Sequence, residues 1–286
     1  MFKLIPYQAQ HFELWNQFLL KAKNANFLFH RDFMEYHSDR FKDNSLLIFK
    51  NKKLIALLPA NRVKNKIYSH QGLTYGGLIL DKKVNYFDVS RIFETLLNSF
   101  RKEGIKEFIY TQSPDYQSIN SCQEIEMALV TLGAKLERCE IASVIELQND
   151  FELLKQKSRI KNYFDKGFQV KQEVDFTNFW NILIQNLKSK HQLMPVHSLH
   201  EIQNLAEKFE NEIQLYTVIK DGEILGGTVL FINHYSAVVH VQYIASTLEG
   251  RKLRVLDLLF PSLIKKYQGQ NTSFGKPFKH FGFGIS

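Results

Sequence analysis

The chain has 286 residues, 44% of them hydrophobic and 23% charged, as is normal for a folded protein with one large core or two modest ones. No apolar run reaches the roughly 18 residues of a membrane-spanning helix, and the first residues lack the apolar stretch of a signal peptide. The only cysteines, Cys122 and Cys139, do not suggest a disulfide framework, so we expect a cytoplasmic protein. The net charge of +8 favours anionic partners such as phosphates, RNA or an anionic membrane face, although evenly spread lysines equally suit a solubilising surface.

The first half of the chain mixes helical and strand patterns. Residues 8–22 have helical periodicity, with Phe12, Trp15, Phe18 and Leu19 on one face. The other expected elements are an aromatic and charged segment over 27–41, strands over 46–50 and 54–60 around a polar turn, an extended stretch over 67–80, a helix over 87–102 ended by Gly104, a strand over 107–111 and a helix over 124–132.

The second half repeats this order. We expect helices over 151–164, 176–189 and 199–209, strands over 214–220, 224–232 and 235–245, a helix over 252–267 and a last strand over 278–283, with a hairpin turn at Asp221-Gly222. Residues 48–56 can be laid over residues 218–226 at an offset of 170. The shared order favours an internal duplication over a chance match of hairpins. We therefore expect two domains, over 1–145 and 146–286.

A strand–turn–strand–strand–helix–strand order builds a mostly antiparallel sheet with a crossover helix. Where the strand before that helix splays from its neighbour, free backbone groups and a helix N-terminus form a cleft for a phosphate-bearing carrier. In this plan residues 214–267 resemble the central unit of the GNAT acyltransferases. Four further stretches bear on the whole chain: HRDFMEYHSDRF (30–41), GLTYGG (72–77), KHQLMPVHS (190–198) and FGFGIS (281–286). In these stretches the whole chain resembles the double-GNAT, FemAB-like proteins of bacterial cell-envelope and polysaccharide gene sets.

The resemblance implies an α/β (α+β) fold of two tandem GNAT-like domains, each a mixed, mostly antiparallel sheet flanked by helices. It also implies an N-acyltransferase that moves an acyl group from acyl-CoA (acetyl-CoA) to an amine on an amino sugar or another cell-envelope precursor. Two alternatives stay open. One is a FemAB-like aminoacyltransferase that uses charged tRNA on a lipid-linked peptidoglycan precursor and touches the membrane surface peripherally. The other is a non-catalytic binding protein. Similar proteins continue beyond such an apolar ending, so the resemblance further implies a missing C-terminal segment.

The expected carrier loop departs from the GNAT pattern. GNAT proteins have Arg/Gln-x-x-Gly-x-Gly/Ala before the helix, whereas this chain has EGRKLR over 249–254 and keeps only Gly250. Bulky residues limit how closely the backbone approaches a pyrophosphate. Arg251, Lys252 and Arg254 are candidate phosphate contacts through their side chains instead. This departure weakens the acyl-CoA reading and leaves room for charged tRNA or for a degenerate site.

Candidate catalytic residues lie in the second half. Strand alternation over 237–245 places His240 and Gln242 on one face, and Val239, Val241 and Tyr243 on the other. His240 is a candidate general base for an amine, with Gln242 and Tyr243 as candidate substrate contacts. The alternative is that these are hydrogen-bonded core or edge residues.

His197 is a second candidate catalytic residue, and His191 a candidate substrate contact. Both follow a predicted helix. Ser198 and Glu201 form a capping box, which explains them without any chemistry and leaves His197 available for a site.

In the first half, Tyr36, His37 and Arg40 are candidate sugar or phosphate contacts, or else a salt-bridged structural support. The glycines around Tyr75 indicate a substrate loop or, equally, a turn. The basic stretch 157–161 favours a solvated helix face over an RNA or phospholipid contact. No cysteine pair or histidine spacing matches a known metal pattern, so we expect no metal.

Overall fold

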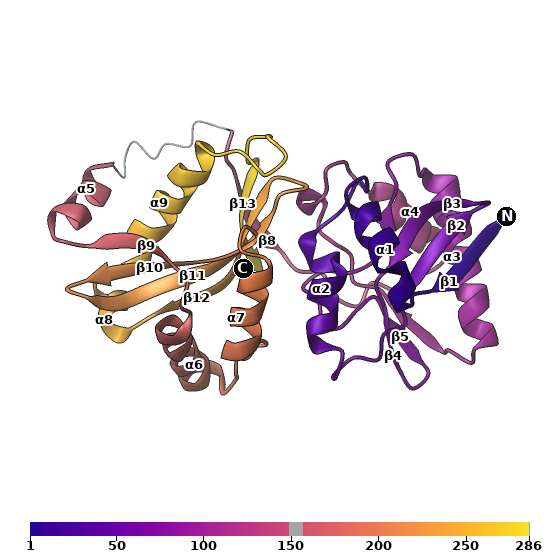
Figure 1. Cartoon of the computed structure of the whole chain (residues 1–286), viewed down its shortest axis with the longest axis horizontal. Helices are drawn as coiled ribbons and strands as arrows, with labels where there is room; N and C mark the ends of the chain where they lie inside the picture. The colour runs from indigo at the N-terminus through magenta and orange to yellow at the C-terminus, as the bar shows by residue number, and fades with distance from the viewer. Residues whose placement is uncertain (149–156, 286) are drawn as a thin grey trace. The chain divides into compact units, whose positions relative to one another are not determined.

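The computed structural model describes residues 1–148 and 157–285 (Figure 1). The chain divides into an N-terminal unit, Met1–Cys139, and a C-terminal unit, Glu140–Ser286. Strand β8 (Ala142–Glu146) pairs with β13 (His280–Ile285), so its residues belong to the C-terminal unit rather than to the first expected domain. No helix in the two described stretches is both long enough and apolar enough to span a membrane.

The N-terminal unit has two small sheets. The first has the order β1-β2-β3-β6 and the second the order β4-β5-β7. Its strands are β1 (Phe2–Pro6), β2 (Leu46–Lys50), β3 (Lys53–Leu58), β4 (Asn61–Val63), β5 (Lys66–Tyr68), β6 (Ile79–Leu80) and β7 (Glu107–Ile109). Its α-helices are α1 (Phe12–Leu19), α2 (Arg31–Met34), α3 (Tyr86–Lys102) and α4 (Gln123–Thr131), and its 3-10 turns are η1 (Ala9–His11), η2 (Phe27–Phe29), η3 (Glu35–His37) and η4 (Asp115–Gln117).

Helix α3 packs one of its faces into the core of this unit. The Asn85 side chain caps its first turn, and Gly104 ends it with a φ of 73°. Apolar residues at helical spacing put one face into the core with β2, β3 and α4: Val89, Ile92, Phe93, Leu96 and Phe100.

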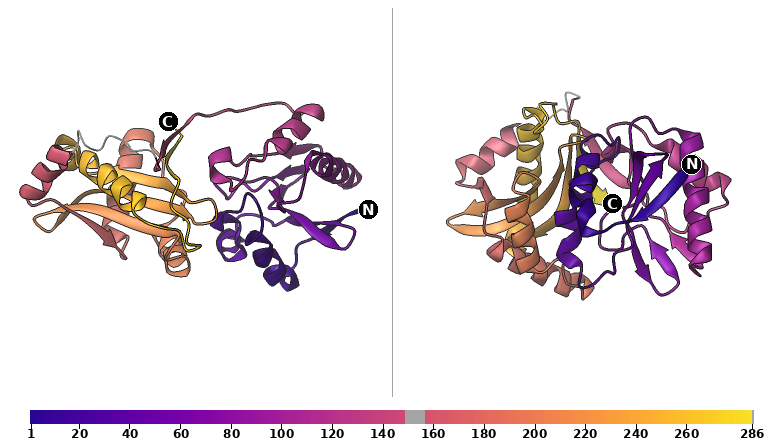
Figure 2. Two further views of the ribbon diagram at one scale, coloured as in Figure 1. Left: turned by 90° about the horizontal axis from the view of Figure 1, so that it is seen from above. Right: turned by 45° about the vertical axis from the view of Figure 1, so that its right-hand side comes forward.

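The C-terminal unit has one six-stranded sheet in the order β8-β13-β12-β11-β10-β9. Helix α9 packs on one face of this sheet and α6 on the other (Figure 1), and the left view of Figure 2 shows α9 running across its face. Besides β8 and β13, the strands are β9 (Gln169–Glu173), β10 (Ile213–Lys220), β11 (Glu223–Asn233) and β12 (Val238–Ser246). The helices are α5 (Lys157–Asp165), α6 (Thr177–His191), α7 (Leu199–Lys208), α8 (Leu248–Lys252) and α9 (Leu256–Gln268).

Several expected elements differ from the structure. The helix predicted over 8–22 is limited to η1 and α1, and the one predicted over 252–267 is split into α8 and α9. Residues 151–156 of the predicted helix 151–164 lie outside the described residues. Strands β1, β4, β8 and β9 were not expected, because short and largely solvent-facing strands carry little apolar alternation.

The two hairpins that suggested a duplication share an irregularity. In β2–β3 the register shifts between Ile48 and Phe49, and in β10–β11 it shifts between Val218 and Ile219. These positions are 170 residues apart, the offset predicted from the sequence. Both turns begin with a left-handed residue, Asn51 with a φ of 57° and Asp221 with a φ of 51°. The two units therefore repeat the hairpin down to its bulge.

Candidate functional site

Strands β12 and β13 separate in the middle of the C-terminal sheet. They pair in parallel only over Val238–His240 and His280–Gly282. Beyond His240, no pairing of β12 with β13 is present in the described part of the chain, whereas the other edge of β12 stays paired to β11 as far as Ser246. From Val241 to Ser246, β12 is therefore paired to β11 on one edge only. This is the separation that we expected for the strand before the crossover helix.

A β-bulge marks the point of separation. Leu230 pairs with Val241 and Val229 pairs with Tyr243, so Gln242 is the extra residue. Val241 packs in the core under α9, whereas Tyr243 packs edge-on against Trp180 of α6. The prediction that Val239, Val241 and Tyr243 share one face is therefore wrong. The bulge reverses the alternation and places Tyr243 on the α6 face.

Tyr243 meets His197 on that face. The hydroxyl oxygen lies 2.6 Å from His197 Nδ1, and the two rings are perpendicular. Burial raises the pKa of Tyr243 to about 12, although hydrogen bonds from the His197 backbone and the Gln242 side chain act in the opposite direction. The pair is a neutral phenol hydrogen-bonded to an imidazole, and the tautomer of His197 decides which of the two groups donates.

The chain around His197 is held firmly. The Ser198 hydroxyl accepts from the Glu201 N–H, and the Glu201 carboxylate accepts from the Ser198 N–H, which confirms the predicted capping box at the start of α7. The His197 ring packs edge-on against Phe231 of β11 and is 5% exposed as a residue. A loop residue is thus fixed against the centre of the sheet.

The other predicted histidines have different positions. His240 is buried opposite Phe231, and burial lowers its pKa to about 4, so it is neutral at physiological pH. A β-carbon on Gly284 would lie 3.4 Å from its ring, which shows how closely β13 covers it. His191 is the last residue of α6, and its side chain lies outside the described part of the structure.

The expected carrier loop forms the short helix α8. The Thr247 hydroxyl caps it by accepting from the Gly250 N–H at 2.9 Å. A β-carbon on Gly250 would lie 2.0 Å from the Leu225 carbonyl oxygen, so this glycine allows α8 to pack on β11. The Arg251 guanidinium donates to Asn186 Oδ1 at 2.7 Å, and the Asn186 amide donates to the Ser246 carbonyl at 2.9 Å. Gly250 and Arg251 therefore anchor the end of β12, and the Lys252 side chain is exposed.

The residues that follow α8 are tied to α5. Arg254 and Arg159 both reach the Asp257 carboxylate, at 2.8 and 2.6 Å. The Tyr163 hydroxyl lies 3.0 Å from the Leu253 carbonyl and 3.1 Å from the Arg254 carbonyl. These contacts join the start of α9 and the residues before it to α5. Within the predicted basic stretch 157–161, Arg159 is one of these contacts.

The N-terminal unit fills the corresponding edge with its own chain. Strand β5 pairs in parallel with β7 over three residues, as β12 does with β13, and β6 pairs with β3 as the end of β12 pairs with β11. Residues 69–78 therefore stand in the place of 241–244. The Ser69 N–H donates to the Ile109 carbonyl at 2.9 Å, and Gly76 bridges to Gln112. A β-carbon on Gly76 would lie 1.7 Å from the Ser69 carbonyl oxygen, so the predicted close backbone approach is an internal one.

The predicted aromatic and basic residues of the N-terminal unit gather around this loop. His37 Nε2 donates to the Gly72 carbonyl at 3.0 Å, and its ring stacks on His70 at 5.2 Å. The Arg40 guanidinium lies over the Tyr36 ring at 5.5 Å. The Tyr75 hydroxyl lies 3.4 Å from that of Tyr116. His37 is buried against the loop, which favours the structural interpretation.

His70 was missed by the sequence analysis. It has a φ of 78°, and its Nδ1 accepts from the Gly72 N–H at 3.3 Å. No spacing signal marked it, because its partner, His37, is distant in the chain. In the described residues, no three His, Cys, Asp or Glu side chains are arranged to hold a metal ion.

We expect His70 to make the N-terminal unit acid-sensitive. Burial, and secondly His37, lower the pKa of His70 to about 3, against an unfolded value near 6.5. Between these pH values the unfolded chain binds more protons than the folded chain does. The free energy of unfolding is therefore highest above pH 6.5 and decreases as the pH falls toward 3. From pH 6.5 to 5 the loss is about 2 kcal/mol. His70→Asn keeps an acceptor and tolerates a positive φ.

Urea unfolding at pH 7.5 and pH 5 measures this effect. The wild-type free energy of unfolding should fall more between the two pH values than that of His70→Asn. Equal losses in both proteins would contradict the prediction. The lowered pKa of His240 also makes stability depend on pH, but this contribution is the same in the wild type and in His70→Asn and cancels when the two are compared.

Comparison with known proteins bears on the architecture. No protein-family model matches the chain, and no curated protein matches it in sequence. Among solved structures, FemX has a TM-score of 0.64 at 12% identity over 99% of this chain and 89% of its own. A tandem GNAT protein from the clavulanic acid biosynthesis pathway has a TM-score of 0.53 at 11% identity over 99% and 90%. The chain has a tandem GNAT-like fold. This confirms the fold expected from the resemblance.

The chain is also similar in fold to L-PGS from Bacillus licheniformis. Its TM-score is 0.60 at 13% identity, over 97% of this chain and 76% of that one. At these identities the likeness concerns the fold, and any activity has to be argued from the site.

Proposed function

We propose that this chain is an acyltransferase that joins an acyl group to an amine, with the reaction centred on the open edge of β12 beside His197 and Tyr243. The separation of β12 from β13 carries the proposal, because it leaves backbone donors and acceptors along which an extended acyl group can align. The contact between Tyr243 and His197 beside the bulge at Gln242 also supports it, because it adds a hydrogen-bonded phenol and imidazole near this edge.

The proposed reaction needs one proton transfer. The amine nitrogen attacks the acyl carbonyl carbon, the new C–N bond forms, and the bond from that carbon to the leaving oxygen or sulfur breaks. The proton lost by the amine passes to the leaving atom. We assign this transfer to His197, which takes the proton from the amine on one ring nitrogen and gives it to the leaving atom, while the Tyr243 hydroxyl is hydrogen-bonded to Nδ1 and orients the ring. No covalent nucleophile is required.

We further propose an aminoacyl ester on tRNA as the donor in preference to acyl-CoA. A pyrophosphate needs exposed backbone N–H groups at a glycine-rich turn. In this chain the Gly250 N–H binds Thr247, and the Asp257 N–H at the start of α9 binds the Arg254 carbonyl. The resemblance to FemAB-like proteins implies a tRNA donor, and the shared fold with FemX is consistent with that branch. The likeness to the tandem GNAT protein, whose structure is described as without AcCoA, keeps acyl-CoA as the second candidate.

Donor binding separates these candidates. Thermal unfolding would be followed with acetyl-CoA, with uncharged tRNA, and with tRNA charged with a full set of radiolabelled amino acids. We expect charged tRNA to raise the unfolding temperature more than uncharged tRNA does. In a separate assay, we expect the radiolabel to be released from the tRNA only when an amine is added. If acetyl-CoA stabilises the chain and neither tRNA does, the donor is acyl-CoA and not aminoacyl-tRNA. An absence of binding and release with all three would leave a non-catalytic binding protein.

A further inference from the structure

An exposed apolar segment lies directly before His197. Leu193, Met194 and Val196 are 60%, 56% and 70% exposed in the turn between α6 and α7. The turn is well defined, because Gln192 closes α6 with a φ of 54° and the Leu193 N–H donates to the Leu187 carbonyl at 3.3 Å. Its other end is fixed by His197 and by the capping box of α7. Three apolar side chains are thus held in water at a position that packing does not explain.

The exposed charges on the α6 side of this segment are positive. Lys188 and Lys190, at the end of α6, are exposed, and the first acidic residue after the segment, Glu201, is engaged in the capping box with Ser198. The C-terminal end of a helix also favours cations there. An apolar tip flanked by lysines matches the interface of an anionic bilayer, where the apolar groups enter the acyl region and the lysines meet the head groups.

We propose that residues 193–196, with Lys188 and Lys190, dock the chain on an anionic lipid bilayer, from which a lipid-linked amine acceptor reaches His197. This inference rests on the proposed function for the acceptor, but the docking itself does not. A protein partner fits less well, because a standard protein interface uses about 20–30 residues on each side, and the exposed apolar tip here is confined to residues 193–196.

The docking can be measured by co-sedimentation with vesicles. Vesicles of phosphatidylcholine alone would be compared with vesicles that contain a third of phosphatidylglycerol. We expect the wild-type chain to bind the anionic vesicles, and the Leu193→Glu/Met194→Glu variant to lose more than tenfold in affinity. Replacing Lys188 and Lys190 by Gln should cost about fivefold for each lysine, and salt should weaken the wild-type binding.

Val174→Glu is the matched control. Val174 is 84% exposed and precedes the other end of the 15-residue helix α6, about 22 Å away along its axis. This variant should bind as the wild type does. The proposal would be overturned if the Leu193→Glu/Met194→Glu variant bound the anionic vesicles as tightly as the wild type does. It would also be overturned if the wild type bound neither kind of vesicle.

The same variants separate docking from catalysis. Leu193→Glu/Met194→Glu should keep donor-dependent transfer to a soluble amine while it loses vesicle binding. If transfer fails in the wild type but vesicle binding follows the expected pattern, the proposed function falls and the docking surface remains.

Discussion

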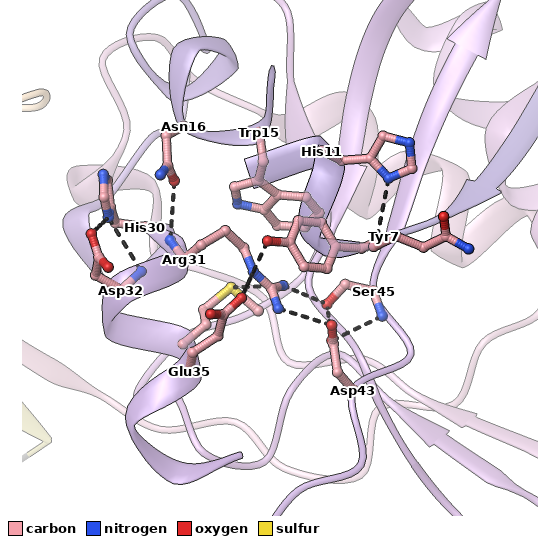
Figure 3. A network of polar contacts seen from close by, with 12 residues as sticks. Tyr7, His11, Trp15, Asn16, His30, Arg31, Asp32, Glu35, Asp43 and Ser45 are labelled. Carbon is pink, nitrogen blue, oxygen red and sulfur yellow. Dashed lines mark hydrogen bonds and ion pairs between the residues drawn. The ribbon is translucent and has the colours of Figure 1, made fainter. Parts of the chain in front are cut away.

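Replacing Arg31 with methionine is expected to lower the free energy of unfolding of the N-terminal unit by about 3 kcal/mol. Arg31 is 2% exposed, and its guanidinium donates to Glu35 at 3.0 Å and to Asp43 at 2.9 Å (Figure 3). The guanidinium carbon also lies 3.6 Å from the centre of the Tyr7 ring. Methionine fills the space of the aliphatic stem but leaves two carboxylates without their cation.

The value lies at the lower end for a buried ion pair, because the side chains of Glu35 and Asp43 are 45% and 34% exposed and regain water. Urea unfolding of the two proteins measures the change. Arg91→Met is the control: Arg91 pairs with Glu94 on the surface of α3, its side chain is 69% exposed, and its replacement should change stability by less than about 0.5 kcal/mol. Similar losses in both variants would show that Arg31 is not the anchor of its unit.

Replacing His197 with asparagine is expected to reduce the proposed transfer by about 100-fold or more in kcat, because asparagine cannot relay a proton. Tyr243→Phe removes only the hydroxyl and should cause a smaller loss, together with a changed pH profile. His200→Asn is the matched control, since His200 is exposed on α7 and pairs with Asn204. The measurement is the rate of label transfer at saturating donor and across pH.

An unchanged rate in His197→Asn would remove this residue from the reaction. A rise in KM at constant kcat would instead make it a binding contact. Circular dichroism of each variant checks that the fold is kept, because the buried Tyr243 hydroxyl also loses a partner in His197→Asn.

The architecture was largely predictable from the sequence. The hairpins at Asn51 and Asp221, the helix over 87–102 and the capping box at Ser198 are set by local signals, namely turn residues, helical periodicity and a side chain that caps a helix. The bulges of the two hairpins are also 170 residues apart, which is the offset found in the sequence. Edge strands such as β1 and β9 were missed because their pairing is decided by distant partners.

The candidate site was less predictable. His197 and Tyr243 were each selected, but their contact depends on the extra residue at Gln242, and the apolar–polar alternation of the sequence continues through that position as if no bulge were present. The stacking of His37 on His70 also depends on how a long loop folds back. Long-range pairings of this kind arise from tertiary structure and have no local sequence signal.

The loop over residues 69–78 has a consequence for stoichiometry. The chain contains two copies of one sheet plan, but in the N-terminal unit this loop occupies the edge that the C-terminal unit leaves open. A ligand that aligns along such an edge has to compete with a covalently attached segment in one copy and only with water in the other. A titration should therefore saturate at one donor molecule for each chain.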